Sequence, residues 1–303
     1  MNLTARSSPP SPVMRSKLFV PASRPELFRK ALASDADAIS FDLEDAVVPG
    51  RREEARAALR AFLGEIDDWT AKVIIVRVNE VGSPDFAKDI AAIAGPAVHF
   101  INLPKVEDPE MIRAAVATLD ETPGSGALVG FLVNIETPKA LRNASALAAS
   151  HPRVAGLQIG YADLLEPSGV DRRDTAALSY IRIAVRMAAA EAGVAAYDGA
   201  YAAVKDPEGF QAECVAARRH GFTGKSCIHP CQVAIANAAF TPTEEEIAQA
   251  TRIIAAAEAA EAEGTGACLV DGHMIDPPFV IRARATLAVA RRTHGAFSSA
   301  GDA

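Results

Sequence analysis

Short apolar runs alternate with longer amphipathic segments along most of this chain, beginning near residue 15. The short runs are rich in β-branched residues and almost continuously apolar, as is typical of strands that are buried on both faces. We therefore predict strands at residues 17–20, 38–42, 72–78, 98–103, 127–135, 154–159 and 224–228, with a weaker eighth strand at 194–197.

The longer segments are rich in alanine, and several carry proline near the first turn, where its missing N–H costs nothing. They predict helices at 25–33, 51–63, 84–93, 109–119, 138–149, 176–192 and 208–220, followed by 243–260 and 279–292. Strands that alternate with helices indicate a parallel sheet covered on both faces. Eight such units favour a closed (β/α)₈ TIM barrel, and neither a GxGxxG motif after the first strand nor a P-loop lysine motif is present to favour an open nucleotide-binding sheet.

The organisation we predict is a flexible Ser/Pro-rich arm at 1–14, a barrel at 15–242 and a C-terminal helix, lid segment and final helix at 243–303.

Half of the residues are apolar and the formal net charge is −7, without a basic block. This balance argues against nucleic acid or an anionic membrane surface as a partner. No run reaches the roughly 18 apolar residues that span a bilayer. The first thirteen residues lack the apolar stretch of a secretory signal, so we expect a cytoplasmic protein.

Polar residues stand where several of the predicted strands end, and these ends converge on one face of a barrel. Glu136 and Asp163 each follow an apolar strand directly, in NIETP and IGYADL. Two such carboxylates could share one Mg²⁺ ion, or Mn²⁺, with water and substrate oxygens completing the shell. Alternatively, they could cap the helices that follow.

Arg77 lies within the apolar run VIIVRVN, and a buried arginine needs an anion or several acceptors. It could clamp a substrate carboxylate or a developing oxyanion, or it could pair internally with the acids of DLED, residues 42–45. Within that segment Asp42 could be structural, whereas Asp45 could hold a water bound to the metal. The same acids could instead complement the positive end of the next helix.

Two cations, Arg24 and Lys30, follow the first strand and suit a phosphate-bearing ligand, although a solvated helix face would look the same. Considered alone, His229, in CIHP, is interpreted as a structural histidine. Asp276, in GHMIDPP, is interpreted as a turn residue before a helix.

Taken together, these segments identify a family. The chain resembles the citrate lyase β-subunit-like proteins of the HpcH/HpaI aldolase/citrate lyase superfamily, close to the malyl-CoA and citramalyl-CoA lyases. The resemblance runs from about residue 15 to residue 292 and rests on eight segments in the family's order: KLFVPASRPELFRKA, ISFDLEDAVVPGRREEAR, IIVRVN, NLPKVE, IETP, IGYADL, GFTGKSCIHPCQVAIANAAFTP and DGHMIDPP.

The resemblance implies a Mg²⁺ ion held by Glu136 and Asp163, with Glu136 and Arg77 at the substrate oxygens. Main-chain groups of Ala162 and Asp163 would hold the substrate carboxylate. The implied reaction is reversible cleavage of a 3-hydroxyacyl-CoA, such as malyl-CoA, methylmalyl-CoA or citramalyl-CoA. Its products are an α-keto acid and acetyl-CoA or a homologue.

The resemblance also implies a homotrimer or a hexamer built as a dimer of trimers, in which Asp276 of the lid reaches a neighbouring subunit as the acid/base group. The positions that match the family's coenzyme A site are Phe19, Arg24, Lys30, Ile228 and His229.

Three other functions stay open at this point. A class II pyruvate aldolase would act on free keto acids, but its histidine base has no counterpart in FDLED. A citrate lyase β subunit would act on an acyl-carrier-protein thioester within a complex. A non-catalytic protein that binds CoA thioesters would have lost a metal ligand or the lid acid, yet Glu136, Asp163, Arg77 and Asp276 are all present.

Overall fold

The computed structural model describes residues 13–66, 72–95, 97–124 and 129–298. Most of the predicted N-terminal arm, residues 1–12, and the first two residues of the predicted strand at 127–135 lie outside this range. The chain divides into two compact units, one ending at Phe240 and the other beginning at Thr241.

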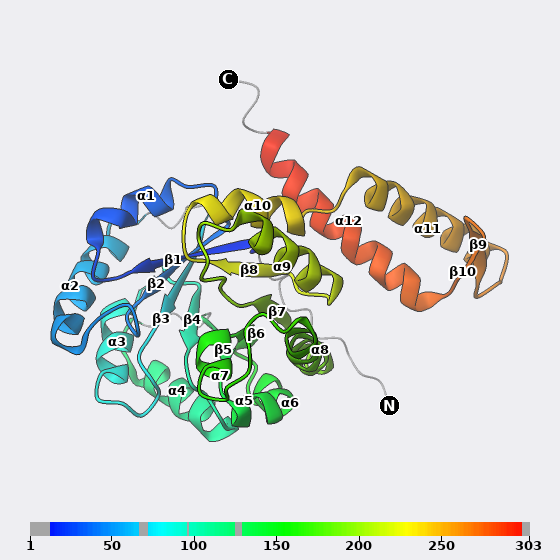
Figure 1. Ribbon diagram of the computed structural model, residues 1–303. Helices are drawn as coiled ribbons and strands as arrows, with labels where there is room; N and C mark the ends of the chain where they lie inside the picture. Colours follow the sequence, from blue (N-terminus) through cyan, green and yellow to red (C-terminus); the bar gives the residue numbers. More distant parts are fainter. Residues whose placement is uncertain (1–12, 67–71, 96, 125–128, 299–303) are drawn as a thin grey trace. The chain divides into compact units, whose positions relative to one another are not determined.

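Eight parallel strands of the first unit form a closed barrel in sequence order, which confirms the predicted fold (Figure 1). The first strand pairs with both the second and the last, so that Lys17 lies opposite Ala38 on one side and Ser226 on the other. The strands are β1 (Ser16–Pro21), β2 (Ala38–Asp42), β3 (Val73–Arg77), β4 (Phe100–Leu103), β5 (Gly130–Ile135), β6 (Val154–Ile159), β7 (Ala195–Asp198) and β8 (Gly224–Cys227).

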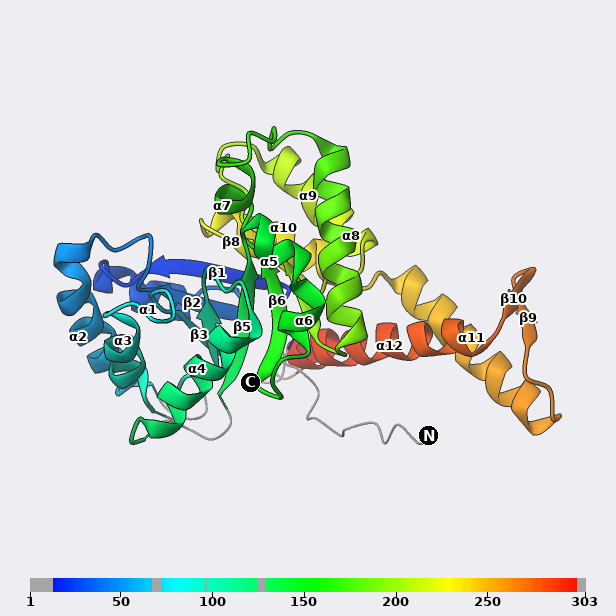
Figure 2. The ribbon, with the colours of Figure 1, turned by 90° about the horizontal axis from the view of Figure 1, so that it is seen from below.

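Helices surround the barrel on its outer side (Figure 2). They are α1 (Phe28–Leu32), α2 (Arg52–Leu63), α3 (Phe86–Ile93), α4 (Pro109–Glu121), α5 (Pro138–Arg142), α6 (Ala144–Ala148), α7 (Tyr161–Leu165), α8 (Thr175–Glu191), α9 (Pro207–Arg219) and α10 (Cys231–Phe240), with 3₁₀ turns η1 (Pro25–Leu27) and η2 (Pro49–Arg51). The predicted helix at 25–33 is therefore a 3₁₀ turn followed by α1, and the one at 138–149 divides at Asn143. Two helices, α7 and α10, have no counterpart among the predictions.

Local sequence explains where these helices begin and which face they bury. Helix α2 buries Ala55, Leu59, Phe62 and Leu63, which recur at helical spacing and pack against the strands. Asp108 is the N-cap of helix α4, and its carboxylate accepts hydrogen bonds from two backbone N–H groups of the first turn. Side chains of Thr137, Asp174 and Asp206 cap α5, α8 and α9 in the same way.

The interior of the barrel changes character along its axis. Its amino-terminal end is filled by apolar side chains: Met14, Ala38, Val73, Ile75, Phe100, Leu132 and Tyr197. Met14 thus belongs to the packed interior, although it falls within the arm predicted at 1–14. Nearer the mouth, the buried inward-facing positions of several strands are polar, including Ser40, Asn102 and Asn134. The larger apolar core lies between the strands and the helices.

The second unit consists of α11 (Glu244–Ala262), the antiparallel strands β9 (Cys268–Val270) and β10 (His273–Ile275), and α12 (Pro277–Ser298). Helices α11 and α12 lie side by side, around a small core that includes Ala250, Ile253 and Ile275 (Figures 1 and 2). Thr243 and Glu246 form a capping box at the start of α11. Within the described residues, no helix is both long and apolar enough to cross a membrane.

Candidate active site at the mouth of the barrel

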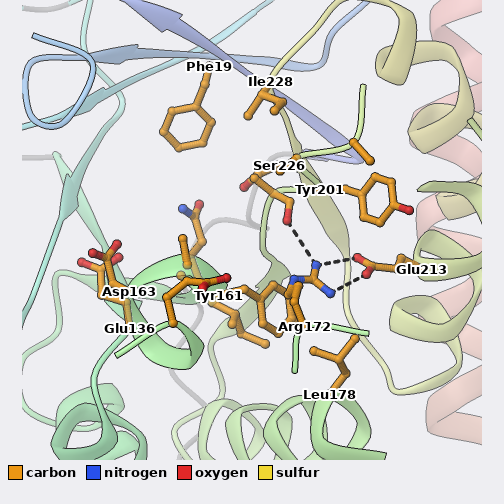
Figure 3. A pocket seen from close by; sticks show the side chains of 18 of the residues that line it. Phe19, Glu136, Tyr161, Asp163, Arg172, Leu178, Tyr201, Glu213, Ser226 and Ile228 are labelled. Atoms are coloured by element: carbon orange, nitrogen blue, oxygen red, sulfur yellow. Dashed lines mark hydrogen bonds and ion pairs between the residues drawn. The ribbon is translucent and has the colours of Figure 1, made fainter. Parts of the chain in front are cut away.

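A pocket of about 1010 Å³ opens at the carboxyl ends of the strands, where active sites of such barrels lie (Figure 3). It is formed entirely by the first unit. Eight of the residues singled out from the sequence line it: Phe19, Asp42, Asp45, Arg77, Glu136, Ala162, Asp163 and Ile228. Three others, Arg24, Lys30 and His229, are not among its described lining residues.

Arg77, the last residue of β3, is held in one orientation by the acids that follow β2. Its Nε and Nη2 donate to the two carboxylate oxygens of Asp42 at 2.8 and 2.6 Å. Its Nη1 lies 2.9 Å from an oxygen of Glu44 and 3.4 Å from one of Asp45. Burial alone lowers the pKa of Arg77, but these carboxylates raise it well above its ordinary value. The internal pairing is therefore present, and the guanidinium also lines the pocket.

Lys105 adds a second cation to this wall and has an unusual backbone. Its Nζ lies 3.0 Å from Glu44 and 3.8 Å from Asp45. Its φ is 49°, in the left-handed region that side chains rarely adopt. In this conformation the Lys105 backbone N–H donates to Glu136 Oε1 at 2.6 Å. Backbone strain is thus located at the residue that fixes the Glu136 carboxylate.

Glu136 follows β5 and its side chain is almost completely buried. Its second oxygen accepts a hydrogen bond from Asn134 Nδ2 at 3.0 Å. Burial raises the pKa of Glu136 to about 7, with further contributions from the charges of Glu44 and Asp163, although the Lys105 N–H opposes the shift. Burial and the neighbouring carboxylates therefore destabilise the ionised form of Glu136.

Glu136 lines the pocket and does not cap the helix that follows it. Thr137 is the N-cap of α5, and its side chain accepts the hydrogen bond from Ala140 N–H. On the facing strand end, a Cβ atom at Gly160 would lie 2.3 Å from Glu136 Oε2. Gly160 therefore has to lack a side chain, because the Glu136 carboxylate occupies that space. Asp163 stands three residues further on, in the first turn of α7.

The composition of this wall fits a divalent cation. Five carboxylates, from Asp42, Glu44, Asp45, Glu136 and Asp163, face two cations, from Arg77 and Lys105. No group of three or more His, Cys, Asp or Glu side chains in the described part of the chain could hold a metal ion alone. Glu136 and Asp163 could supply two carboxylates to Mg²⁺, which commonly takes its other ligands from water and substrate.

The opposite wall, formed beyond β6, β7 and β8, is built from buried ion pairs. Asp198 is fully buried and accepts hydrogen bonds from Arg182 Nε at 3.1 Å and from Lys225 Nζ at 2.6 Å. Although burial raises the pKa of Asp198, Lys225 and Arg182 hold it well below its ordinary value. Lys225 also lies 2.9 Å from Glu213. These charges compensate one another within the wall.

This wall supports the segment that carries Asp163. The hydroxyl of Tyr161, two residues before Asp163, donates to Asp198 at 2.7 Å. The guanidinium of Arg172 lies 4.2 Å from the centre of the Tyr161 ring and makes two hydrogen bonds to Glu213, at 2.6 and 3.0 Å (Figure 3). The ion pairs thus fix the start of α7 and the α7–α8 connection along the pocket.

The remaining candidates from the sequence are not among the described residues that line the pocket. Arg24 is exposed and pairs with Glu26 at 2.8 Å, while Lys30 is exposed on α1. Exposed His229 places Nδ1 3.0 Å from the thiol of Cys231. Asp276 belongs to the second unit, where its backbone carbonyl accepts the N–H of Phe279 at the start of α12. Its Oδ1 is buried without a hydrogen-bond partner among the described residues.

The pairings of the second wall were missed by the sequence reasoning. Asp198 ends the strand with the weakest pattern, and Arg182 lies inside an amphipathic helix where it resembles a surface residue. Arg172 lies between the strand predicted at 154–159 and the helix predicted at 176–192, where no local pattern distinguishes it. The one available signal was the unusual lysine in GKSC, the otherwise small and apolar strand β8.

Comparisons with known proteins agree with this geometry. The sequence profile of the family described as HpcH/HpaI aldolase/citrate lyase matches residues 15–230. A (3S)-malyl-CoA thioesterase of Cereibacter sphaeroides is 39% identical over 277 residues, covering 91% of this chain and 94% of the relative. An L-malyl-CoA/beta-methylmalyl-CoA lyase of the same organism is 32% identical over 300 residues, with the same coverage of both chains.

Solved structures are similar as well. The protein CitE from Mycobacterium tuberculosis, in complex with magnesium, acetoacetate and coenzyme A, superposes with a TM-score of 0.74 and 31% identity. The match covers 92% of this chain and 98% of that protein. A citrate lyase beta subunit from M. tuberculosis, complexed with oxaloacetate and magnesium, gives a TM-score of 0.64 and 32% identity, covering 76% of this chain and 98% of the other.

Proposed function

The chain belongs to the HpcH/HpaI aldolase/citrate lyase family, and we propose that it is a Mg²⁺-dependent lyase that cleaves a carbon–carbon bond of a 3-hydroxyacyl-CoA. The substrates we propose are malyl-CoA and its methyl-substituted homologues, methylmalyl-CoA and citramalyl-CoA. The observation that carries the proposal is the excess of carboxylates over cations in the wall that holds Glu136, Asp163 and Arg77. Relatives and structural neighbours that act on malyl-CoA or hold magnesium and coenzyme A support it.

Glu136 and Asp163 would hold the metal, which when bound supplies a Lewis acid for the hydroxyl and carboxylate oxygens of the substrate. Lys105 keeps Glu136 in place through its backbone N–H, and Gly160 leaves the space that the carboxylate occupies. Arg77, fixed by Asp42, points positive charge at the oxygen on which negative charge develops. Asp45, which is half exposed beside Arg77, can hold a water molecule at the same place. Mn²⁺ could replace Mg²⁺ at this site, because both ions accept a shell made only of oxygen ligands.

Cleavage also requires a proton at the α-carbon of the departing acyl-CoA, and we assign this transfer to Asp276 of the second unit. Phe19 and Ile228 line the pocket and would contact coenzyme A. The exposed side chains of Arg24, Lys30 and His229 would meet its phosphates outside the pocket. The working assembly we propose is a homotrimer or a pair of trimers, with Asp276 completing a neighbour's site.

Hydrolysis of the thioester is a second candidate function, favoured by the 39% identity to a malyl-CoA thioesterase. The two reactions use the same ligand but release different products. Cleavage of malyl-CoA yields glyoxylate and acetyl-CoA without a free thiol, whereas hydrolysis yields malate and the free thiol of coenzyme A.

A single assay separates these reactions. Malyl-, methylmalyl- and citramalyl-CoA in both stereochemical forms are incubated with Mg²⁺ or with EDTA, while keto acid and free thiol are measured in parallel. We expect keto-acid release that EDTA abolishes and that equals acetyl-CoA or propionyl-CoA formation. Thiol release without keto acid would replace the lyase by a thioesterase, and turnover that survives EDTA would remove the metal from the proposal.

The proposed role of Asp276 can be tested by mixing two inactive variants. Glu136→Gln removes a metal ligand from the first unit, and Asp276→Asn removes the acid from the second. If Asp276 serves a neighbouring subunit, subunits refolded together at equal concentration should recover about a quarter of the wild-type activity, because random mixing restores a fraction of intact sites. No recovery, with both variants assembled by light scattering, would place Asp276 within its own subunit's site or outside catalysis.

A further inference from the structure

One buried side chain joins two of the loops that form the pocket. Gln232, in the first turn of α10, is only 2% exposed, although glutamine usually lies at the surface of proteins. Its Oε1 accepts a hydrogen bond from the backbone N–H of Ile228 at 2.8 Å, and its Nε2 donates to the backbone carbonyl of Tyr201 at 3.0 Å. Ile228 and Tyr201 both line the pocket (Figure 3).

The two loops that Gln232 joins follow consecutive strands of the barrel. The β7–α9 loop, residues 199–206, contains Tyr201, and the β8–α10 loop, residues 228–230, contains Ile228. A backbone N–H can only donate and a backbone carbonyl can only accept, so the orientation of the Gln232 amide is determined by its partners. Glutamine supplies both roles without a charge, whereas lysine or ionised glutamate would supply only one.

The β7–α9 loop is also held by contacts that do not involve α10. The hydroxyl of Tyr201 donates to Asp206, which is the N-cap of α9. The backbone carbonyl of Ala200 accepts a hydrogen bond from Arg172 Nη2 at 3.3 Å, and Arg172 is itself held by Glu213. This loop is therefore a fixed point to which the Gln232 amide ties its neighbour.

The β8–α10 loop carries residues that we propose for coenzyme A. Ile228 is 40% exposed and presents its apolar side chain to the pocket. His229 follows directly, and its backbone carbonyl accepts the backbone N–H of Gln232 at 3.0 Å. The side chain of Gln232 thus holds the first of these residues, while its main chain holds the second.

We propose that Gln232 is a positioning residue for coenzyme A, which holds Ile228 and His229 in the arrangement that binds the ligand. This inference rests on the proposed function, which assigns those two residues to coenzyme A. Without the amide, the Ile228 N–H and the Tyr201 carbonyl lose their partner, and the loop recovers part of that cost by moving until water reaches them. The fraction of molecules that can bind then falls, and the apparent dissociation constant rises in proportion.

Coenzyme A itself is the probe, because its binding requires no turnover. Gln232→Met keeps nearly the same side-chain length but removes both hydrogen bonds. Gln211→Met makes the same replacement at an exposed position of α9 and is the control. In calorimetric titrations of the full-length protein, we expect the dissociation constant to rise roughly tenfold in Gln232→Met, as for one or two neutral hydrogen bonds, and to stay unchanged in the control.

Turnover of two malyl thioesters distinguishes positioning from general damage to the fold. Malyl-CoA carries the nucleotide and its phosphates, whereas the malyl thioester of N-acetylcysteamine lacks them. In Gln232→Met we expect KM for malyl-CoA to rise about tenfold while kcat stays within about twofold of wild type. The kcat/KM for the short thioester should not change. An equal loss with both thioesters would overturn the proposal and leave Gln232 with a role in stability alone.

Gln232→Glu is the alternative if Gln232→Met does not fold. Its carboxylate keeps the acceptor for Ile228 but opposes the carbonyl of Tyr201, and protonation restores a donor there. Its affinity for coenzyme A relative to wild type should therefore recover as the pH is lowered. Equal affinity in wild type and both variants at every pH would overturn this inference alone. A wild-type protein that does not bind coenzyme A would overturn it together with the proposed function.

Discussion

The two walls of the pocket are both rich in charge, yet they differ in how the charge is balanced. The wall formed by the residues that follow β2 to β5, together with Asp163 of α7, sets five carboxylates against two cations. The wall beyond β6–β8 sets Asp198 and Glu213 against Arg172, Arg182 and Lys225. Each carboxylate of the second wall is shared by two or more cations, whereas Glu136 in the first wall receives only neutral N–H donors. The unbalanced wall is suited to a ligand, and the balanced wall is suited to holding the fold.

Removing the carboxylate of Glu136 should have the largest effect on catalysis and a small effect on stability. For Glu136→Gln we expect Mg²⁺-dependent turnover to fall roughly a thousandfold, since a metal ion contributes several kcal/mol of transition-state stabilisation. The melting temperature without metal should stay the same or rise, because a carboxylate with a raised pKa is lost.

Steady-state kinetics and thermal unfolding with and without Mg²⁺ measure both effects. Glu110→Gln, an exposed carboxylate on α4, is the control and should behave as wild type. A Glu136→Gln protein that Mg²⁺ still stabilises as strongly as wild type would contradict the assignment of this wall to the metal.

Breaking the balanced wall should produce the reverse result, a loss of stability. Glu213→Gln leaves Arg172 and Lys225 without their shared anion, and we expect unfolding to become easier by about 2–4 kcal/mol. Burial raises the pKa of Glu213, but Lys225 and Arg172 lower it below its ordinary value of 4.5. Its contribution to stability is therefore fully present above pH 4.5 and is lost as the pH falls below that value, through the lowered pKa of the folded protein.

The difference in unfolding free energy between wild type and Glu213→Gln should accordingly be largest near neutral pH and shrink toward pH 3. Denaturant titrations at several pH values measure it. Glu54→Gln, which removes an exposed partner of Arg51, is the control and should leave stability unchanged at every pH. A gap between wild type and Glu213→Gln that widens in acid would show that the pairing is not the stabilising element.

Arg77 belongs to the unbalanced wall, but it is itself paired with carboxylates. Replacing it by lysine should therefore have the smallest of the three effects. Lysine keeps the charge but cannot contact both oxygens of Asp42 while reaching Glu44. We expect kcat/KM of Arg77→Lys to fall roughly 10- to 100-fold, by about 1–3 kcal/mol, with Mg²⁺ affinity little changed. Arg60→Lys on the outer face of α2 is the matched control, and an unchanged kcat/KM in Arg77→Lys would remove Arg77 from the reaction.

The barrel and the unbalanced wall were accessible from the sequence because both depend on local order. Eight apolar runs separated by helical segments require a parallel sheet, and a charged residue that ends such a run must emerge at one face. Glu136 and Arg77 were found for this reason. The resemblance to a family then added Ala162 and the role assigned to Asp276, which periodicity alone could not supply.

The balanced wall and the buried contact between Lys17 and Gln158 were not accessible, because the partners are distant in sequence and, apart from the lysine in GKSC, each residue has an ordinary local setting. Lys17 and Gln158 lie within apolar strands, 141 residues apart, and only barrel closure brings them together. A local signal was overlooked in the second unit, where Asp271 and Gly272, both with positive φ, form the turn between β9 and β10. An Asp-Gly pair between alternating residues is the strongest short-range indication of a hairpin.

The pocket can form only late in folding, because β1 must first pair with β8. Lys17 leaves the ribosome among the first residues of the barrel, but Gln158 and Ser226 follow only after most of the barrel has been synthesised. Contacts between such distant segments carry a high loop-closure cost and form late. A nascent or truncated chain that stops before residue 224 therefore carries a lysine inside an unfinished sheet without the strand that completes its surroundings. Recovery of ligand binding should consequently lag behind recovery of secondary structure when the protein refolds.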